Sequence, residues 1–391
     1  MRVFVVQNVS MTRHMALSTY LRNFVSSLSQ IDYLDITVLT SEGINKNADD
    51  SDHNIISSGT DLYTLSGNLY FIFWSLYTLF RCSLQGHIDV IHCLYPSSST
   101  LGCLLFKYLF SPKTKIVYDI RSPWIIMSTK RGKIRGSMKI FFQAGALVLE
   151  RILLRIVDAV VFITDGLRRY YAQLGLEPPK IWITSPSGVD TEHFQPRESN
   201  TLRETIGVES SRKILGYAGG IAVTRELSFV VLSFRKLQEE TNQSWALVFV
   251  GDGDNLLGLK RLVHDYQIPQ VYFVGKVSYD LIPEMIADFD VSVCHLPQTP
   301  LFDTSFPMKV LEYLACGVPV IMSDMPAHQE LDKRLNGTYL YDFDETDFTN
   351  AAIDAVQYNS VDTSQLKFYS WTEIASRISR LYSHLMVKQS H

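Results

Sequence analysis

The stretch TSFPMKVLEYLACGVPVIMSD (residues 304–324) decides the fold of the second half of the chain, because it has the pattern of a short helix followed by a buried strand. Pro307 suits the first turn of a helix, where its missing N–H costs nothing, and Gly317 suits a helix end. The run Val318–Met322 continues as an apolar strand. One carboxylate, Glu312, lies in this mostly apolar helix and needs an explanation. The predicted buried stripe comprises Met308, Leu311, Leu314 and Ala315.

Short apolar runs alternate with helical patterns along the whole chain, as in the amphipathic stretch Glu226–Gln238. Such alternation implies parallel sheets whose two faces are covered by helices. A polar stretch at residues 189–199 separates two series of this kind. We therefore predict an α/β fold of two doubly wound domains, residues 1–192 and 193–368, facing each other across a cleft. The predicted strands are Val3–Val6, Ile36–Leu39, Val90–His92, Ile116–Ile120, Ala159–Ile163, Ile214–Ala218, Ala246–Val250, Val271–Val274, Val291–Cys294 and Val318–Met322.

Composition excludes several functional classes. The 391 residues carry a net charge of −4, whereas a general nucleic-acid binder needs a strongly basic face. The five cysteines form no C-x-x-C pair, which argues against a zinc or redox site and for a reducing compartment. The N-terminus is a poor secretory signal, so we expect a cytoplasmic protein. Polar residues interrupt the apolar stretch Leu62–Phe80 and charges interrupt Ile140–Thr164, so we expect neither to cross a membrane.

The loop after strand Ile214–Ala218 reads GGIAVTREL. Gly219 and Gly220 let backbone N–H groups approach a ligand closely, and Arg225 follows at the start of the next helix. A glycine turn at a helix start, with a cation beside it, is suited to bind an anion. The alternative is that the two glycines only make a tight turn. GDGD (residues 251–254) follows the next strand and is interpreted as a turn rather than a calcium site, because the rest of an EF-hand pattern is missing.

The helix in the stretch 304–324 follows the strand Val291–Cys294 and a loop, so it begins beyond the carboxyl ends of the strands, where open α/β sheets bind ligands. Its first-turn N–H groups and Lys309 can contact phosphates, and Glu312 can accept hydrogen bonds from the two hydroxyls of a ribose. The alternative is that Glu312 pairs with Lys309 on a solvated face. The D-x-D sequence at Asp288 and Asp290 precedes a strand instead of following one, so we do not expect a metal there.

In the first half, KIVYDIRSPW places Asp119, Arg121 and Trp124 at the end of a strand. Burying an acid beside an arginine is costly unless the pair has a role, although a structural ion pair is the alternative. His92 ends the preceding strand and is interpreted as a core residue. Residues 128–143 carry five positive charges and no acid before an apolar run. This segment is either a surface loop or a contact with an anionic membrane surface.

Several motifs in this order resemble a known family. SFPMKVLEYLACGVPVI looks like the donor-site helix of the retaining glycosyltransferases of family 4, which have the two-domain GT-B architecture. SGVDTEHFQP (residues 187–196) looks like the junction between their domains, and VFVGDGD followed by VYFVGKV keeps their strand order. YSWTEIASRISRLY (residues 369–382) resembles their C-terminal helix, which crosses back onto the first domain, so residues 369–391 are expected there. The resemblance implies two Rossmann-like domains, the first binding the acceptor and the second the donor.

The resemblance also implies roles for individual residues. Glu312 would hold the ribose of a nucleotide-sugar, and Arg225 and Lys309 would neutralise the leaving diphosphate in place of a metal or other cofactor. Arg121 and Asp119 would lie beside the acceptor and the transferred sugar. The predicted catalytic residues are therefore Arg225, Lys309, Arg121 and Asp119. Backbone contacts to the donor complete the predicted binding set, at Gly219, Gly220, Gly251, Val277 and Met308.

Three departures from the family pattern stand out. The family often has a second Glu eight residues before Glu312, whereas this chain has Thr304. The glycine pair after the first strand is replaced by QNVSMTRHM (residues 7–15), in which Arg13 or His14 would have to substitute. The usual Arg and Lys pair near the second glycine turn is reduced to Arg225.

We therefore predict a metal-independent hexosyltransferase. It would move a sugar from a nucleotide diphosphate sugar to a hydroxyl acceptor with retention, in polysaccharide, lipopolysaccharide or capsule assembly. The expected acceptor is a lipid-linked or growing oligosaccharide, with residues 128–143 attaching the enzyme to the inner face of the cytoplasmic membrane. One alternative is another GT-B enzyme, such as a sugar-nucleotide epimerase or a phosphorylase. The other is a non-catalytic nucleotide-sugar-binding partner of a synthase, which Thr304 makes conceivable.

Overall fold

The computed structural model describes residues 1–10, 16–42, 54–59, 65–95, 98–123, 137–242, 244–358 and 360–387. The chain divides into two compact units. The first comprises Met1–Gly188, Thr304–Phe306 and Trp371–His391, and the second comprises Val189–Asp303 and Pro307–Ser370. The sequence prediction placed these boundaries after residues 192 and 368.

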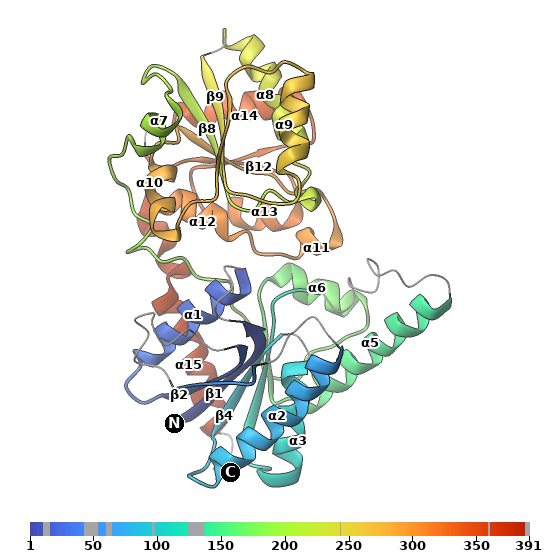
Figure 1. Ribbon diagram of the computed structural model, residues 1–391. Coiled ribbons are helices and arrows are strands. Elements are labelled where there is room, and N and C mark those ends of the chain that lie inside the picture. The colour runs from blue at the N-terminus through green and yellow to red at the C-terminus, as the bar shows by residue number, and fades with distance from the viewer. Residues whose placement is uncertain are drawn as a thin grey trace. The chain divides into compact units, whose positions relative to one another are not determined.

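The first unit contains a sheet of seven parallel strands in the order β3-β2-β1-β4-β5-β6-β7 (Figure 1). The chain winds outward from β1 in one direction and from β4 in the other, which is a doubly wound topology. The sequence did not predict β3 or β7, because each is an edge strand of only four or three residues. The strands are β1 (Arg2–Ser10), β2 (Asp35–Glu42), β3 (Asn54–Ser57), β4 (Val90–Leu94), β5 (Lys115–Ile120), β6 (Ala159–Phe162) and β7 (Trp182–Thr184).

Helices cover both faces of this sheet. One core layer contains Phe71, Phe106 and Leu153, which come from three helices on the same face. The opposite layer contains Phe24 and Ile378, because the C-terminal helix packs beside the first helix. The helices are α1 (Ala16–Ser29), α2 (Leu65–Ser83), α3 (Ser98–Phe110), α5 (Ser137–Ile156), α6 (Asp165–Gln173) and α15 (Trp371–Val387).

Both stretches that resemble membrane spans fall in this unit. Leu62–Phe80 overlaps α2, and Ile140–Thr164 is divided between α5 and β6. Among the described residues, none of the helices is both long enough and apolar enough to cross a membrane.

The second unit contains a sheet of six parallel strands in the order β10-β9-β8-β11-β12-β13. The winding direction reverses between β8 and β11, so the crevice at the carboxyl ends of these two strands is the expected ligand position. The predicted α/β class with two doubly wound parallel sheets is therefore confirmed. The strands are β8 (Lys213–Ala218), β9 (Trp245–Val250), β10 (Val271–Gly275), β11 (Val291–Cys294), β12 (Val320–Ser323) and β13 (Thr338–Tyr341), the last of which the sequence did not predict.

Helices of the second unit connect these strands (Figure 1). The helix predicted from Glu226 begins two residues later, since Glu226 has a left-handed φ of 51° that ends a short 3₁₀ turn, η1 (Val223–Arg225). The helices are α7 (Thr201–Ile206), α8 (Ser228–Glu240), α9 (Leu256–Asp265), α10 (Ile282–Ala287), α11 (Pro300–Asp303), α12 (Met308–Ala315), α13 (Pro326–Asp332) and α14 (Glu345–Val356), with two further 3₁₀ turns, η2 (Tyr279–Leu281) and η3 (Thr363–Tyr369).

Helix α12 is the helix predicted from residues 304–324. It ends in a Schellman motif, because Gly317 has a φ of 82° and its N–H donates to Leu314 while the Val318 N–H donates to Tyr313. The predicted strand start at Val318 is wrong by two residues. The Val318 N–H closes the helix end and Pro319 has no N–H, so β12 begins at Val320. The helix is also more buried than predicted, since Val310 and Tyr313 are fully buried beside the expected stripe.

Candidate functional site

Three turns at the carboxyl ends of β8, β9 and β10 pack backbone against backbone. The Gly219 N–H donates to the Val250 carbonyl at 2.8 Å, and the Gly251 N–H donates to the Gly275 carbonyl at 2.8 Å. Gly251 has a φ of 141°, and a Cβ at this position would overlap the Gly219 carbonyl oxygen. The glycines are therefore required by close packing of the turns. By contrast, a Cβ on Gly220 would meet nothing within 4 Å, so this part of the turn is open.

Lys309 extends from the first turn of α12 across Gly219. A Cβ on Gly219 would overlap the Nζ and Cε atoms of Lys309, so the lysine occupies the space that a side chain would fill. The Nζ atom lies 3.8 Å from the ring centroid of Tyr217 and is buried, and it has no hydrogen-bond partner within the described part of the chain. Burial lowers the pKa of the Lys309 ammonium well below its usual range, and the charge of Arg225 lowers the pKa further.

Glu312 lies one turn further along α12 and is half-buried. Neither a hydrogen bond to its carboxylate nor an ion pair with Lys309 is found among the described residues, so the surface pair that the sequence left open is not formed. Burial raises the pKa of the Glu312 carboxyl to about 7, although the nearby charge of Lys309 opposes the rise. Within the described residues, the site therefore combines an ammonium and a carboxylate for which no hydrogen-bond partner is found, which is an arrangement suited to a ligand with acidic and hydroxyl groups.

Two tyrosines that the sequence analysis missed hold this arrangement together. The Tyr313 hydroxyl accepts a hydrogen bond from the Ala218 N–H at 2.9 Å and donates to the Ala218 carbonyl at 3.2 Å, which fastens α12 to the end of β8. The Tyr217 hydroxyl donates to the Gly220 carbonyl at 2.7 Å, and the face of its ring contacts the Lys309 Nζ atom. No local motif marks either residue, because both act through contacts distant in sequence.

The remaining residues of the predicted donor set lie around this centre. Arg225 is half-buried in η1, and its charge acts on both Lys309 and Tyr217. Met308 is the first residue of α12 and Val277 follows β10. The structure therefore brings the glycine turn, Arg225, Lys309 and Glu312 together in one unit. Their binding roles remain predictions.

Thr304 groups with the first unit, although α12 belongs to the second. Its carbonyl accepts a hydrogen bond from the Thr164 Oγ1 at 2.9 Å, and Phe306 packs against the core of the first unit. The position where relatives often carry an acid is thus buried in this chain.

Asp119 and Arg121 form a buried network in the first unit. The Arg121 Nη2 donates to the Asp119 Oδ2 at 2.7 Å and also contacts the Tyr20 hydroxyl, while its Nη1 donates to the Ser185 carbonyl. The His92 Nε2 lies 3.1 Å from the same Asp119 oxygen. Burial alone would raise the pKa of Asp119, but Arg121 and His92 outweigh that effect and hold the pKa below its usual value.

This network has the geometry of the structural ion pair that the sequence left open. His92 is a core residue, as interpreted, because its Nδ1 is also hydrogen-bonded to the hydroxyl of Tyr382 on α15. The catalytic assignment of Asp119 and Arg121 stays a prediction. Trp124, Arg13, His14 and the basic residues 128–136 lie outside the described residues.

The two aspartates of the D-x-D sequence interact with other residues of the second unit. Asp288 accepts hydrogen bonds from the backbone N–H groups of Leu202 and Arg203, and Asp290 pairs with Arg203 and Lys213. Both acids thus stabilise the start of the second unit. Across the described ranges, no group of three or more His, Cys, Asp or Glu side chains is arranged to hold a metal.

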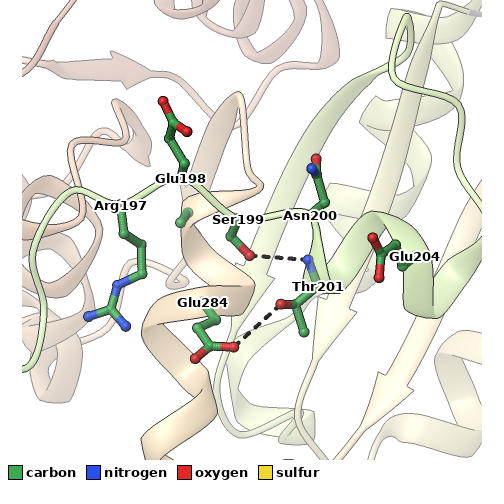
Figure 2. Close-up of a pocket in the computed structure, with 8 residues that line it drawn as sticks. Arg197, Glu198, Ser199, Asn200, Thr201, Glu204 and Glu284 are labelled. Atoms are coloured by element: carbon green, nitrogen blue, oxygen red, sulfur yellow. Dashed lines mark hydrogen bonds between the residues drawn. The ribbon is translucent and has the colours of Figure 1, made fainter.

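A separate pocket lies at the beginning of the second unit, between the segment that leads into α7 and helix α10 (Figure 2). There the Thr201 Oγ1 donates to Glu284 and the Thr201 N–H donates to Ser199. The pocket contains none of the residues predicted to bind the donor. Its lining residues are Arg197, Glu198, Ser199, Asn200, Thr201, Glu204, Glu284 and Ala287.

Comparison with known proteins agrees with the resemblance. Residues 198–362 match the family model described as "Glycosyl transferases group 1", and residues 17–193 match the model described as "Glycosyltransferase Family 4". Together these ranges take in most of both units. The chain is a glycosyltransferase similar to those of family 4.

Individual relatives of this glycosyltransferase are distant. N-acetyl-alpha-D-glucosaminyl L-malate synthase of Bacillus anthracis is 23% identical over 274 residues, 70% of this chain and 66% of that protein. The putative teichuronic acid biosynthesis glycosyltransferase TuaH of Bacillus subtilis is 24% identical over 60% of this chain and 55% of its own length. The matched region thus spans between half and two thirds of these curated relatives.

Solved structures show the same fold over the full chain. The Anabaena protein HepE, crystallised in complex with UDP, aligns with a TM-score of 0.73 and 15% identity, covering 98% of this chain and 100% of that one. The two parallel sheets with alternating helices are those of the GT-B architecture.

We predict that Gly219→Ala destabilises the glycosyltransferase whereas Gly220→Ala does not. Gly219 has a φ of 138°, and its added Cβ would also displace the Lys309 side chain, which together should cost about 1–3 kcal/mol. Thermal unfolding should show a Tm lowered by several degrees only for Gly219→Ala. Equal Tm values for the two variants would contradict the close approach of Lys309.

The raised pKa of Glu312 predicts a pH-dependent stability effect. Because the folded state keeps the proton up to about pH 7, whereas an unperturbed glutamate carboxyl loses it near pH 4.5, this stabilising contribution is complete below pH 4.5 and is lost as the pH rises through 7. Glu312→Gln should therefore raise the Tm relative to the unsubstituted protein more at pH 8 than at pH 5. The exposed Glu240→Gln is the control, and it should show no such pH trend.

The buried network predicts that Asp119→Asn costs about 3–5 kcal/mol of unfolding free energy, because Arg121 is left without a counter-charge. The double variant Asp119→Asn/Arg121→Met should recover most of that loss in urea denaturation. Additive losses in the double variant would contradict the ion pair. A stable double variant that has lost activity would support the catalytic prediction for these residues.

Proposed function

We propose that this glycosyltransferase moves a sugar from a nucleotide diphosphate sugar to a hydroxyl acceptor with retention of configuration, without a metal. The observation that carries the proposal is the buried Lys309 ammonium, which lacks a hydrogen-bond partner in the described chain. It lies against Gly219, at the switch point of the second sheet, where the winding direction reverses between β8 and β11. An unpaired buried cation is costly, and a diphosphate would supply its counter-charge.

The proposed donor position follows from the surrounding groups. The diphosphate would lie between Lys309, Arg225 and the first turn of α12, where the N–H groups of a helix start favour an anion. Glu312, one turn further on, would accept hydrogen bonds from the two ribose hydroxyls. The backbone at Gly219, Gly220, Gly251, Val277 and Met308 would complete the contacts to the donor.

In the proposed reaction, the bond between the anomeric carbon and the diphosphate oxygen breaks, and its electron pair stays on the diphosphate. The acceptor hydroxyl oxygen forms the new bond to the anomeric carbon, and its proton passes to a diphosphate oxygen. Lys309 and Arg225 stabilise the charge that develops on the leaving group. No side chain is assigned as a nucleophile.

The acceptor that we propose is a lipid-linked or growing oligosaccharide in polysaccharide, lipopolysaccharide or capsule assembly. The similarity to a putative teichuronic acid biosynthesis glycosyltransferase supports this class of pathway. UDP-sugars are the first donors to test, because a structural neighbour was crystallised with UDP.

The purified enzyme, mixed with UDP-sugars and an extract of lipid-linked saccharides, should release UDP only when the acceptor is present. We expect Lys309→Met and Glu312→Gln to lower the rate by about 10²–10³, since each removes a group that binds the donor directly. Lys333→Met, which removes an exposed lysine of the same unit, should leave the rate unchanged. Full activity in both site variants would overturn the proposal, and UDP binding without transfer would favour a binding module.

A further inference from the structure

Three helices on one face of the first sheet expose large apolar side chains to solvent. We call the outer surface of these helices the α2–α3–α5 face. Phe73 and Tyr77 of α2 are 64% and 57% exposed, Leu109 of α3 is 63% exposed, and Val148 and Ile152 of α5 are about half exposed. Scattered apolar residues on a surface are ordinary, but an apolar patch of this extent marks an interaction site.

The exposed residues repeat at helical spacing, which gives each helix an outer apolar stripe. In α2 the stripe runs through Tyr70, Phe73 and Tyr77, and in α5 it runs through Val148 and Ile152. A second apolar side of each helix faces the core. Helices with apolar residues on both sides are normally buried on both sides. The outer stripes therefore indicate a surface that is covered by another molecule or by a membrane.

The three stripes point away from the same sheet face. The inner sides of α2, α3 and α5 all contribute to one core layer, on the face opposite to α1 and α15. Phe80 of α2 and Phe110 of α3 pack with ring centroids 4.7 Å apart, and the Tyr108 hydroxyl of α3 donates to the carbonyl of Ile156 at the end of α5. Figure 1 shows the three helices along one side of this sheet.

The charges on these helices are almost all positive. The sequences of α2, α3 and α5 contain five basic residues and a single acid, Glu150, whereas the whole chain has a net charge of −4. Glu150 is fully buried and accepts a hydrogen bond from Tyr118, so the helices expose no acid. Three of the cations are exposed, namely Arg81, Arg151 and Arg155.

We propose that the α2–α3–α5 face lies in the interface of a lipid bilayer that carries anionic headgroups. Apolar side chains beside cations, without exposed acids, match the acyl boundary and the charged headgroups of such a surface. A second copy of the chain fits less well, because it would place cation against cation. Attachment is to the bilayer surface, since none of the described helices can cross a membrane. This surface is built from described residues alone and does not depend on residues 128–136.

The test is flotation of the full-length enzyme with vesicles of phosphatidylcholine containing 30% phosphatidylglycerol, compared with vesicles of phosphatidylcholine alone. The enzyme should float with the anionic vesicles and much less with the neutral ones. Phe73→Gln/Leu109→Gln, at two largely exposed positions, should lower the bound fraction at least tenfold. Arg155→Gln should lower binding to the anionic vesicles roughly fivefold, which corresponds to the loss of one surface cation.

Leu257→Gln is the matched control, because Leu257 is 68% exposed on α9 of the second unit, and it should leave flotation unchanged. Absence of vesicle binding, or equal binding by the Phe73/Leu109 variant, would overturn the proposal. A dimer in analytical ultracentrifugation that the same variant dissociates would also overturn it, by identifying the face as a subunit contact. UDP binding by each variant is measured in parallel, so that failure of the donor-site proposal remains distinguishable from failure of this one.

Discussion

The candidate site of the second unit is built around one buried ammonium group. Lys309 places its Nζ atom over the ring of Tyr217 and against a glycine that has no side chain to obstruct it. A charge removed from water must be paired, lose its proton, or be held at a cost in stability. Here burial and the charge of Arg225 lower the pKa of the ammonium, and its Nζ atom has no hydrogen-bond partner in the described chain. Gly219 and the Tyr217 ring contact this group, and Tyr313 fastens the helix that carries it to the end of β8.

The two units treat buried charge in opposite ways. In the first unit, the Asp119 Oδ2 atom accepts a hydrogen bond from Arg121 and lies beside His92, so the buried carboxylate is paired within the protein. In the second unit, Lys309 and Glu312 are close enough to affect each other's pKa but form no ion pair. A satisfied network contributes rigidity, whereas unsatisfied groups at a switch point are available to a ligand. The same topology thus carries a buried hydrogen-bonded network in one unit and a candidate binding centre in the other.

The sequence predicted the fold class because apolar runs and helical periodicity extend through both units. Its misses have physical causes. Strands β3, β7 and β13 contain only three or four residues, and the start of β12 was displaced because the Val318 N–H belongs to the helix end. Lys309 and Glu312 were singled out by their position in an apolar helix. Tyr313 and Tyr217 could not be identified from the sequence, since their hydroxyl contacts depend on how α12 meets β8. The sequence also left open whether Asp119 and Arg121 form a structural ion pair or have a catalytic role. Their hydrogen-bonded network involves Tyr20, His92 and Tyr382, whose positions the sequence does not give.

The lowered pKa of Lys309 has a consequence for each round of catalysis. If a diphosphate occupies the site as proposed, its negative charge raises the pKa of the amine toward its ordinary range, so donor binding and proton binding to Lys309 favour each other. When the nucleoside diphosphate departs, the pKa falls again and the protons taken up on binding are released. Donor entry and product exit are then accompanied by opposite proton fluxes, so that the heat of nucleotide binding varies with the ionisation enthalpy of the buffer.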